Sequence, residues 1–187
     1  MNLYLLRHTR TVIEASICHG QTDIGLPPDF AHDLATIRAK LPDLSGMTIY
    51  ASPLQRCRLL AEALAPGRVH CDARLMELNF GEWEGQPWDA IDRVALDHWA
   101  ADFVHRAPPG GESFAQLQAR CLDFLVALPE DQDVLLVTHA GVIRAVLAHA
   151  RSLPLDRAFE IPVGHGEISS ICWSYQHSNQ NSTEKDQ

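Results

Sequence analysis

The chain alternates short apolar runs with longer stretches in which apolar residues recur at helical spacing. Near-continuous apolar runs predict strands buried on both faces at residues 2–7, 47–51 and 133–138. A shorter run predicts a fourth strand at 68–71, and alternation predicts a fifth at 167–174.

Amphipathic stretches between these runs predict helices. They cover residues 30–41, 53–65, 86–103, 114–128 and 142–151. Ser52 and Pro53 have the character of an N-cap and a first-turn residue for the second helix. Ser113 and Gln116 form a capping box for the fourth.

Strands that alternate with helices predict an α/β fold of three layers, with a mostly parallel central sheet covered by helices on both faces. The 187 residues, 46% of them hydrophobic, suffice for one well-buried domain. We expect this domain at 1–175 and a polar, disordered tail at 176–187. The apolar runs are too short for a membrane span, and no secretory signal is visible, so we expect a cytoplasmic protein.

The net charge of −9 without a lysine-rich run excludes general nucleic-acid binding. An acidic protein of this kind binds an anion only where Arg and His gather locally. The five cysteines are an odd number without a C-x-x-C pair, which predicts no disulfide framework. The histidines show no metal-ligand spacing, so we expect no metal and no cofactor.

Cation-capable side chains follow three of the predicted strands. Arg7 and His8 close the first, Arg56 follows the second, and His139 closes the third. Ligands of open α/β sheets bind outside the carboxyl ends of the strands, where these four side chains can meet. Guanidinium groups match phosphate oxygens, and imidazole serves as a nucleophile or base near neutral pH. The pattern therefore predicts phosphoryl transfer.

A proton donor for the leaving oxygen is expected in LMELNFGEWEG, residues 75–85. Glu77, Glu82 and Glu84 are candidates, because a carboxyl group in a partly apolar pocket can hold its proton near neutral pH. Glu77 precedes a predicted loop and is our choice, although the residues alone leave all three open.

Five motifs together resemble the histidine phosphatase superfamily, which has the phosphoglycerate-mutase-like fold. They are LLRHTRT, SPLQRCRLLAE, LMELNFGEWEG, GGES and VTHAGVIR, and they stand in the family's order and spacing from residue 3 to about 145. CHGQTDIGL, at 18–26, is similar to the branch that contains α-ribazole phosphatase. The resemblance implies a metal-independent phosphomonoesterase that forms a phosphohistidine and acts on α-ribazole 5′-phosphate or a phosphorylated cobamide of the cobalamin pathway.

The resemblance also implies residue roles. His8 is the nucleophile, Arg7 and Arg56 clamp the phosphate, and His139 completes the pocket. Glu77 protonates the leaving alcohol and then deprotonates the attacking water. The substrate-binding residues are Gly20, Gln21 and Thr22 at the mouth and Gly141 beside His139, and further substrate-side candidates are His19 and His165.

Three positions depart from the family's pattern. Thr9 and Arg10 stand where Gly and Glu are common, and Glu14 stands where the mutases carry Asn. With the short chain, these departures favour a phosphatase over a mutase. Two alternatives stay open: a broad sugar-phosphate or nucleotide phosphatase, and a non-catalytic phosphate-binding regulatory protein. We expect a small phosphate monoester as partner and a monomer or homodimer.

Overall fold

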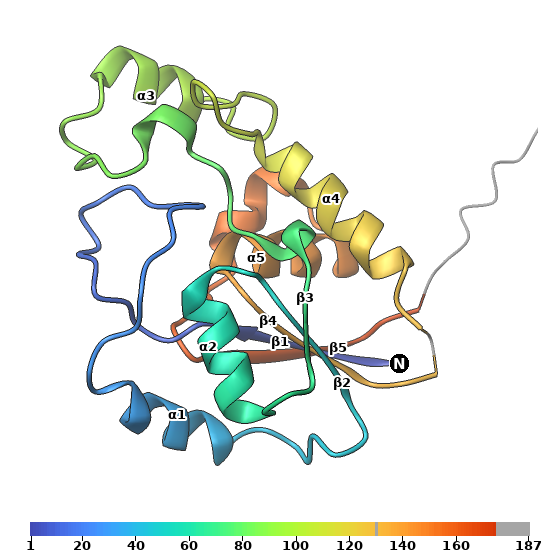
Figure 1. Ribbon diagram of the computed structural model, residues 1–187. Helices are drawn as coiled ribbons and strands as arrows, with labels where there is room; N and C mark the ends of the chain where they lie inside the picture. The colour runs from blue at the N-terminus through green and yellow to red at the C-terminus, as the bar shows by residue number, and fades with distance from the viewer. Residues whose placement is uncertain (130, 175–187) are drawn as a thin grey trace, which may run out of the picture.

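The computed structural model describes residues 1–129 and 131–174. One central sheet of five strands runs through it in the order β3-β2-β4-β1-β5 (Figure 1). The strands are β1 (Asn2–Arg7), β2 (Thr48–Ala51), β3 (Val69–Cys71), β4 (Val134–Thr138) and β5 (Ile168–Cys172). β5 pairs antiparallel with β1, and the other pairs are parallel. The expected mostly parallel sheet is therefore confirmed, while the predicted tail at 176–187 lies outside the described residues.

Helices cover both faces of the sheet (Figure 1). They are α1 (Phe30–Arg38), α2 (Gln55–Leu64), α3 (Arg93–Ala100), α4 (Phe114–Val126) and α5 (Ala140–Ala150), with short 3-10 turns η1 (Ala73–Leu75), η2 (Gly81–Trp83) and η3 (Leu155–Glu160). One core packs Ile37 and Leu60, from α1 and α2, against the sheet. The core on the other face packs Leu117 and Val146, from α4 and α5. Three layers result, as the alternation of elements predicts.

The apolar runs predict the strands well because β4 is fully buried along its whole length, Val134–Thr138. The capping box of α4 is also present, with Ser113 accepting from the amide of Gln116. No helix in the described part of the chain is long and apolar enough to cross a membrane.

The predicted helix at 86–103 is wrong over its first half. The helix α3 begins only at Arg93, after Asp92, whose side chain accepts the amide of Ala95 at 2.8 Å. Before it, Pro87 forms an isolated bridge with Ile17 of the loop after β1. This pairing with a distant segment replaces the local helix, and proline at 87 lacks the N–H that a helix interior requires.

The predicted cap of the second helix is also wrong. α2 begins at Gln55 with Leu54 in the N-cap position, and no side chain caps it. Ser52 is fully buried, and its hydroxyl lies 2.8 Å from Nε2 of His139. The hydroxyl therefore serves the candidate site instead of the helix.

Candidate active site

The carboxyl ends of β1, β4 and β2 lie side by side in the sheet. Arg7 of β1 is level with Thr138 of β4, and Val137 of β4 is level with Ala51 of β2. The first residues beyond these strands therefore meet at one edge, as the sequence predicts. The amide of His8 donates to the carbonyl of Thr138 at 3.0 Å, and this hydrogen bond fixes the backbone of His8 at the end of β1.

His8 is held with one ring nitrogen engaged. Its Nδ1 lies 2.7 Å from the carbonyl oxygen of Thr9, so Nδ1 carries the proton and Nε2 keeps the lone pair. Burial lowers the pKa of His8 well below its usual value, and the charges of Arg56 and Arg7 lower it further, against the Thr9 hydrogen bond. The ring of His139 stands edge-on to it at 5.2 Å between centroids. His8 is thus a neutral imidazole, which is the nucleophilic form.

Two guanidinium groups flank this edge, and both are anchored by backbone carbonyls. Nη1 of Arg7 donates to Val163 O at 2.7 Å. Arg56 donates to Thr22 O at 2.8 Å and also to Gly20 O. The Nε atoms of Arg7 and Arg56 are buried and have no hydrogen-bond partner among the described residues. A buried donor without a partner is costly, so these N–H groups suit an anionic ligand.

His139 is fully buried at the N-cap of α5. Its Nε2 lies 2.8 Å from Ser52 Oγ and 3.4 Å from Cys57 Sγ. Burial lowers the pKa of His139 well below its usual value, and His8 and Arg56 add to this effect. Sequence reasoning missed Ser52 and Cys57 here, because their partner is 87 and 82 residues away.

Glu77 is fixed at the start of α5. Its Oε1 accepts the amides of Gly141 at 3.1 Å and Leu78 at 2.9 Å. A Cβ at position 141 would fall under 3.0 Å from Oε1, so a side chain there would displace the Glu77 carboxylate from this position. From the family resemblance, Gly141 is expected beside His139 as a substrate-binding residue. In the structure, the group that closely approaches Gly141 is the carboxylate of Glu77. Burial lowers the pKa of Arg7, against the charge of Glu77.

Glu84 engages a different set of groups. Its carboxylate accepts the amides of Gln21 at 2.8 Å, Thr22 at 2.6 Å and Phe80 at 3.1 Å, and also the Thr22 hydroxyl. Burial opposes ionisation, but these hydrogen bonds lower the pKa of Glu84. Glu84 thus holds the mouth loop and Glu82 is exposed, whereas the Glu77 carboxylate lies at the start of α5.

The mouth residues Gly20, Gln21 and Thr22 lie between Glu84 and Arg56. A Cβ at Gly20 would fall under 3.0 Å from the carbonyl of Leu78, so this loop packs directly on the Glu77 segment. Nε2 of Gln21 donates to the Glu77 carbonyl at 3.1 Å.

The two candidate histidines lie at different places. Nδ1 of His19 is 2.8 Å from Ile17 O, within its own loop. The ring of His165 lies 5.4 Å from that of His8.

Arg144 is a further cation that sequence reasoning missed. Its Nε donates to Ile161 O at 3.0 Å, and its guanidinium lies 5.1 Å from the ring centroid of Phe159. Burial lowers the pKa of Arg144, against the charge of Glu77. Arg144 closes the VTHAGVIR motif one helical turn after Gly141, and this spacing is the signal that could have identified it.

The described residues contain no group of three or more His, Cys, Asp or Glu that could hold a metal ion. All five cysteines are free thiols.

An α/β sheet with neutral histidines and buried guanidinium donors at its strand ends defines a phosphate-binding protein of the phosphoryl-transfer class. The chain belongs to the histidine phosphatase superfamily, branch 1, whose family model matches residues 3–184.

Relatives support this assignment along most of the chain. An adenosylcobalamin/alpha-ribazole phosphatase of Salmonella typhimurium is 27% identical over 93% of this chain and 89% of that protein. A glucosyl-3-phosphoglycerate phosphatase of Mycolicibacterium vanbaalenii is 32% identical over 82% of this chain and 76% of that protein. The crystal structure of an alpha-ribazole phosphatase from Shigella flexneri superposes with a TM-score of 0.83 at 26% identity, covering 93% and 91% of the two chains. The chain is therefore a hydrolase that acts on phosphate monoesters.

Proposed function

We propose that this enzyme hydrolyses phosphate monoesters through a phosphohistidine at His8, without a metal ion. The observation that carries the proposal is the neutral His8 beside the guanidinium groups of Arg7 and Arg56, whose Nε atoms are buried and have no partner among the described residues. Positioning and charge stabilisation supply most of the catalysis in phosphoryl transfer, and Arg7 and Arg56 are placed to supply both.

In the first step, Nε2 of His8 attacks phosphorus in line and forms the N–P bond. The P–O bond to the alcohol breaks, its electron pair goes to the alcohol oxygen, and protonated Glu77 gives that oxygen its proton. The guanidinium groups of Arg7 and Arg56 offset charge on the phosphoryl oxygens, and His139 completes the pocket.

In the second step, a water molecule attacks the phosphohistidine. Glu77, now ionised, takes a proton from the water, and the N–P bond breaks with its electron pair returning to Nε2 of His8. Inorganic phosphate leaves, and both catalytic groups regain their starting protonation.

For the substrate, we propose α-ribazole 5′-phosphate or a phosphorylated cobamide of the cobalamin pathway. The support is the likeness to α-ribazole phosphatases over nine-tenths of the chain. The second candidate is a broader sugar-phosphate or nucleotide phosphatase, which the likeness to glucosyl-3-phosphoglycerate phosphatase favours.

Steady-state kinetics on a panel of phosphate esters, with EDTA present, tests this proposal. We expect turnover to persist, with kcat/KM for α-ribazole 5′-phosphate more than about tenfold above that for ribose 5-phosphate or nucleotides, or roughly 1.4 kcal/mol of transition-state binding. A smaller preference supports the broader phosphatase.

The matched variants are His8→Asn and His98→Asn, the latter on the exposed side of α3. We expect only His8→Asn to abolish turnover. Equal activity of His8→Asn and wild type, or complete loss of wild-type activity with EDTA, contradicts the mechanism. Phosphate binding without product release would favour the regulatory alternative.

A further inference from the structure

The residues after the nucleophile, Thr9 and Arg10, are fastened to α1. Nη2 of Arg10 lies 2.9 Å from Asp29 Oδ2 and 3.3 Å from Asp33 Oδ1. Asp29 is the N-cap residue of α1, and Asp33 lies in its first turn. Arg10, which departs from the family's pattern, thus connects the loop after His8 to the first turn of α1. The two aspartates compensate its charge.

A cavity of about 380 Å³ lies between this loop, α1 and the segment before β5. Its volume is in the range of small-molecule sites. It is lined by Thr9, Arg10, His32, Asp33, Thr36, Ile37, Lys40, His165 and Gly166. Ile37 is the only apolar side chain in this lining. The cavity therefore has a more polar lining than most small-molecule sites.

The cavity begins beside the nucleophile. Thr9 is buried and directly follows His8, and the ring of His165 lies 5.4 Å from the ring of His8. The amide of Gly166 lies 3.2 Å from the carbonyl oxygens of both Arg7 and His8, which fixes the second wall of the cavity to the end of β1.

We propose that this cavity holds the part of the substrate remote from the reacting phosphate, and that this part is a hydroxylated, sugar-like group. The inference rests on the proposed phosphomonoesterase activity and specifies its substrate class. Hydroxyl, carboxylate and imidazole side chains such as Thr36, Asp33 and His165 pair with sugar hydroxyl groups, which both donate and accept. The amino group of Lys40 has no hydrogen-bond or ion-pair partner among the residues that the structure describes and adds a donor.

The charge state of His165 suits this role. Burial lowers the pKa of His165 to about 4, with contributions from the charges of Arg7 and Arg10. At neutral pH the ring is uncharged, so it offers one donor and one acceptor to a hydroxyl group.

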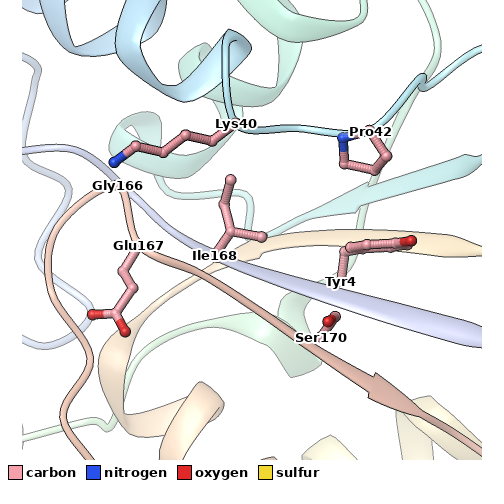
Figure 2. Close-up of a pocket in the computed structure, with 7 residues that line it drawn as sticks. All are labelled: Tyr4, Lys40, Pro42, Gly166, Glu167, Ile168 and Ser170. Carbon is pink, nitrogen blue, oxygen red and sulfur yellow. The ribbon is translucent and has the colours of Figure 1, made fainter.

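A second cavity, of about 340 Å³, lies along β5, and its lining shares Lys40 and Gly166 with that of the first. Figure 2 shows the Lys40 side chain extending toward Gly166, with Tyr4, Ile168 and Ser170 below it.

Filling the cavity with a larger side chain tests the proposal. Thr36→Trp fills it from the exposed face of α1, and Ala35→Trp is the matched control, because Ala35 is exposed on the same helix and does not line the cavity. We expect Thr36→Trp to lower kcat/KM for ribose 5-phosphate and α-ribazole 5′-phosphate at least tenfold, and to leave p-nitrophenyl phosphate within twofold of wild type. Ala35→Trp is expected to change neither.

Equal effects of Thr36→Trp on all three esters, or no effect on any, overturn the proposal. Thr36→Phe repeats the test with a smaller side chain if thermal unfolding shows that Thr36→Trp destabilises the fold. Absence of phosphatase activity in the wild type would instead overturn the proposed function, so the two failures are distinguishable.

Discussion

At the scale of single residues, the site depends on imidazole rings that stay neutral. His8 is 4% exposed and His139 is fully buried, and cations surround both rings. Burial and the neighbouring guanidinium charges lower the pKa of each histidine. The arrangement keeps Nε2 of His8 free for attack in a pocket that attracts anions.

The same pKa shifts predict how stability depends on pH. The usual histidine value is 6.5, so below this pH the unfolded chain binds protons at positions 8 and 139 that the folded chain does not. The contribution of these two histidines to the free energy of unfolding is therefore fully present above pH 6.5. It falls as the pH drops, by about 1.4 kcal/mol per pH unit for each histidine, until the folded-state pKa of that histidine is reached.

Urea unfolding between pH 7.5 and 5 measures this slope. We expect His8→Asn to reduce it by the share of one histidine, whereas His98→Asn retains the wild-type slope. A flat profile down to pH 5, or equal slopes in wild type and His8→Asn, contradicts this view of His8.

At the scale of elements, the mouth loop links the Glu84 carboxylate to the Arg56 guanidinium group. Glu84 accepts from the amides of Gln21 and Thr22, while the carbonyls of Gly20 and Thr22 accept from Arg56. One short loop thus connects the LMELNFGEWEG segment with the first turn of α2. Its order sets where the Nε donor of Arg56 lies.

Glu84→Gln is therefore expected to weaken binding of inorganic phosphate, measured as its inhibition constant. The amide group of the variant faces the backbone N–H donors that Glu84 accepts from, and it carries no charge. Because hydrogen bonds to a charged group contribute about 1.5–3 kcal/mol, we expect the inhibition constant of phosphate to rise roughly tenfold. Glu82→Gln, two residues away and exposed, is the control that keeps the wild-type constant. Equal constants in both variants would show that the loop does not act on the phosphate site.

The elements also show what the sequence could and could not predict. The strands and most helices follow from local apolar patterns, because the spacing of apolar residues along the chain matches the period of a strand or a helix. The turns at 86–92 do not, because Pro87 pairs with Ile17 of a distant loop. Ser52 was missed for the same reason: its contact with His139 depends on how the strands and helices come together.

At the scale of the whole molecule, the sheet order brings distant parts of the chain to one edge. β2, β4 and β1 are neighbours, so the residues that follow them meet although they lie far apart in the sequence. Arg7, His8, Arg56 and His139 could be predicted from this topology. The position of Glu77 was open from the residues alone, because its place at the start of α5 depends on tertiary packing.

The central claim is that the phosphoryl group passes through His8, and trapping the intermediate tests it most directly. Rapid mixing of wild-type enzyme with a labelled phosphate monoester, followed by alkaline quench and peptide mass analysis, is expected to find one acid-labile phosphoryl group on His8. The intermediate should form and decay at least as fast as the steady-state turnover. Normal turnover with no phosphorylated enzyme, or with the phosphoryl group on another residue, would contradict the account.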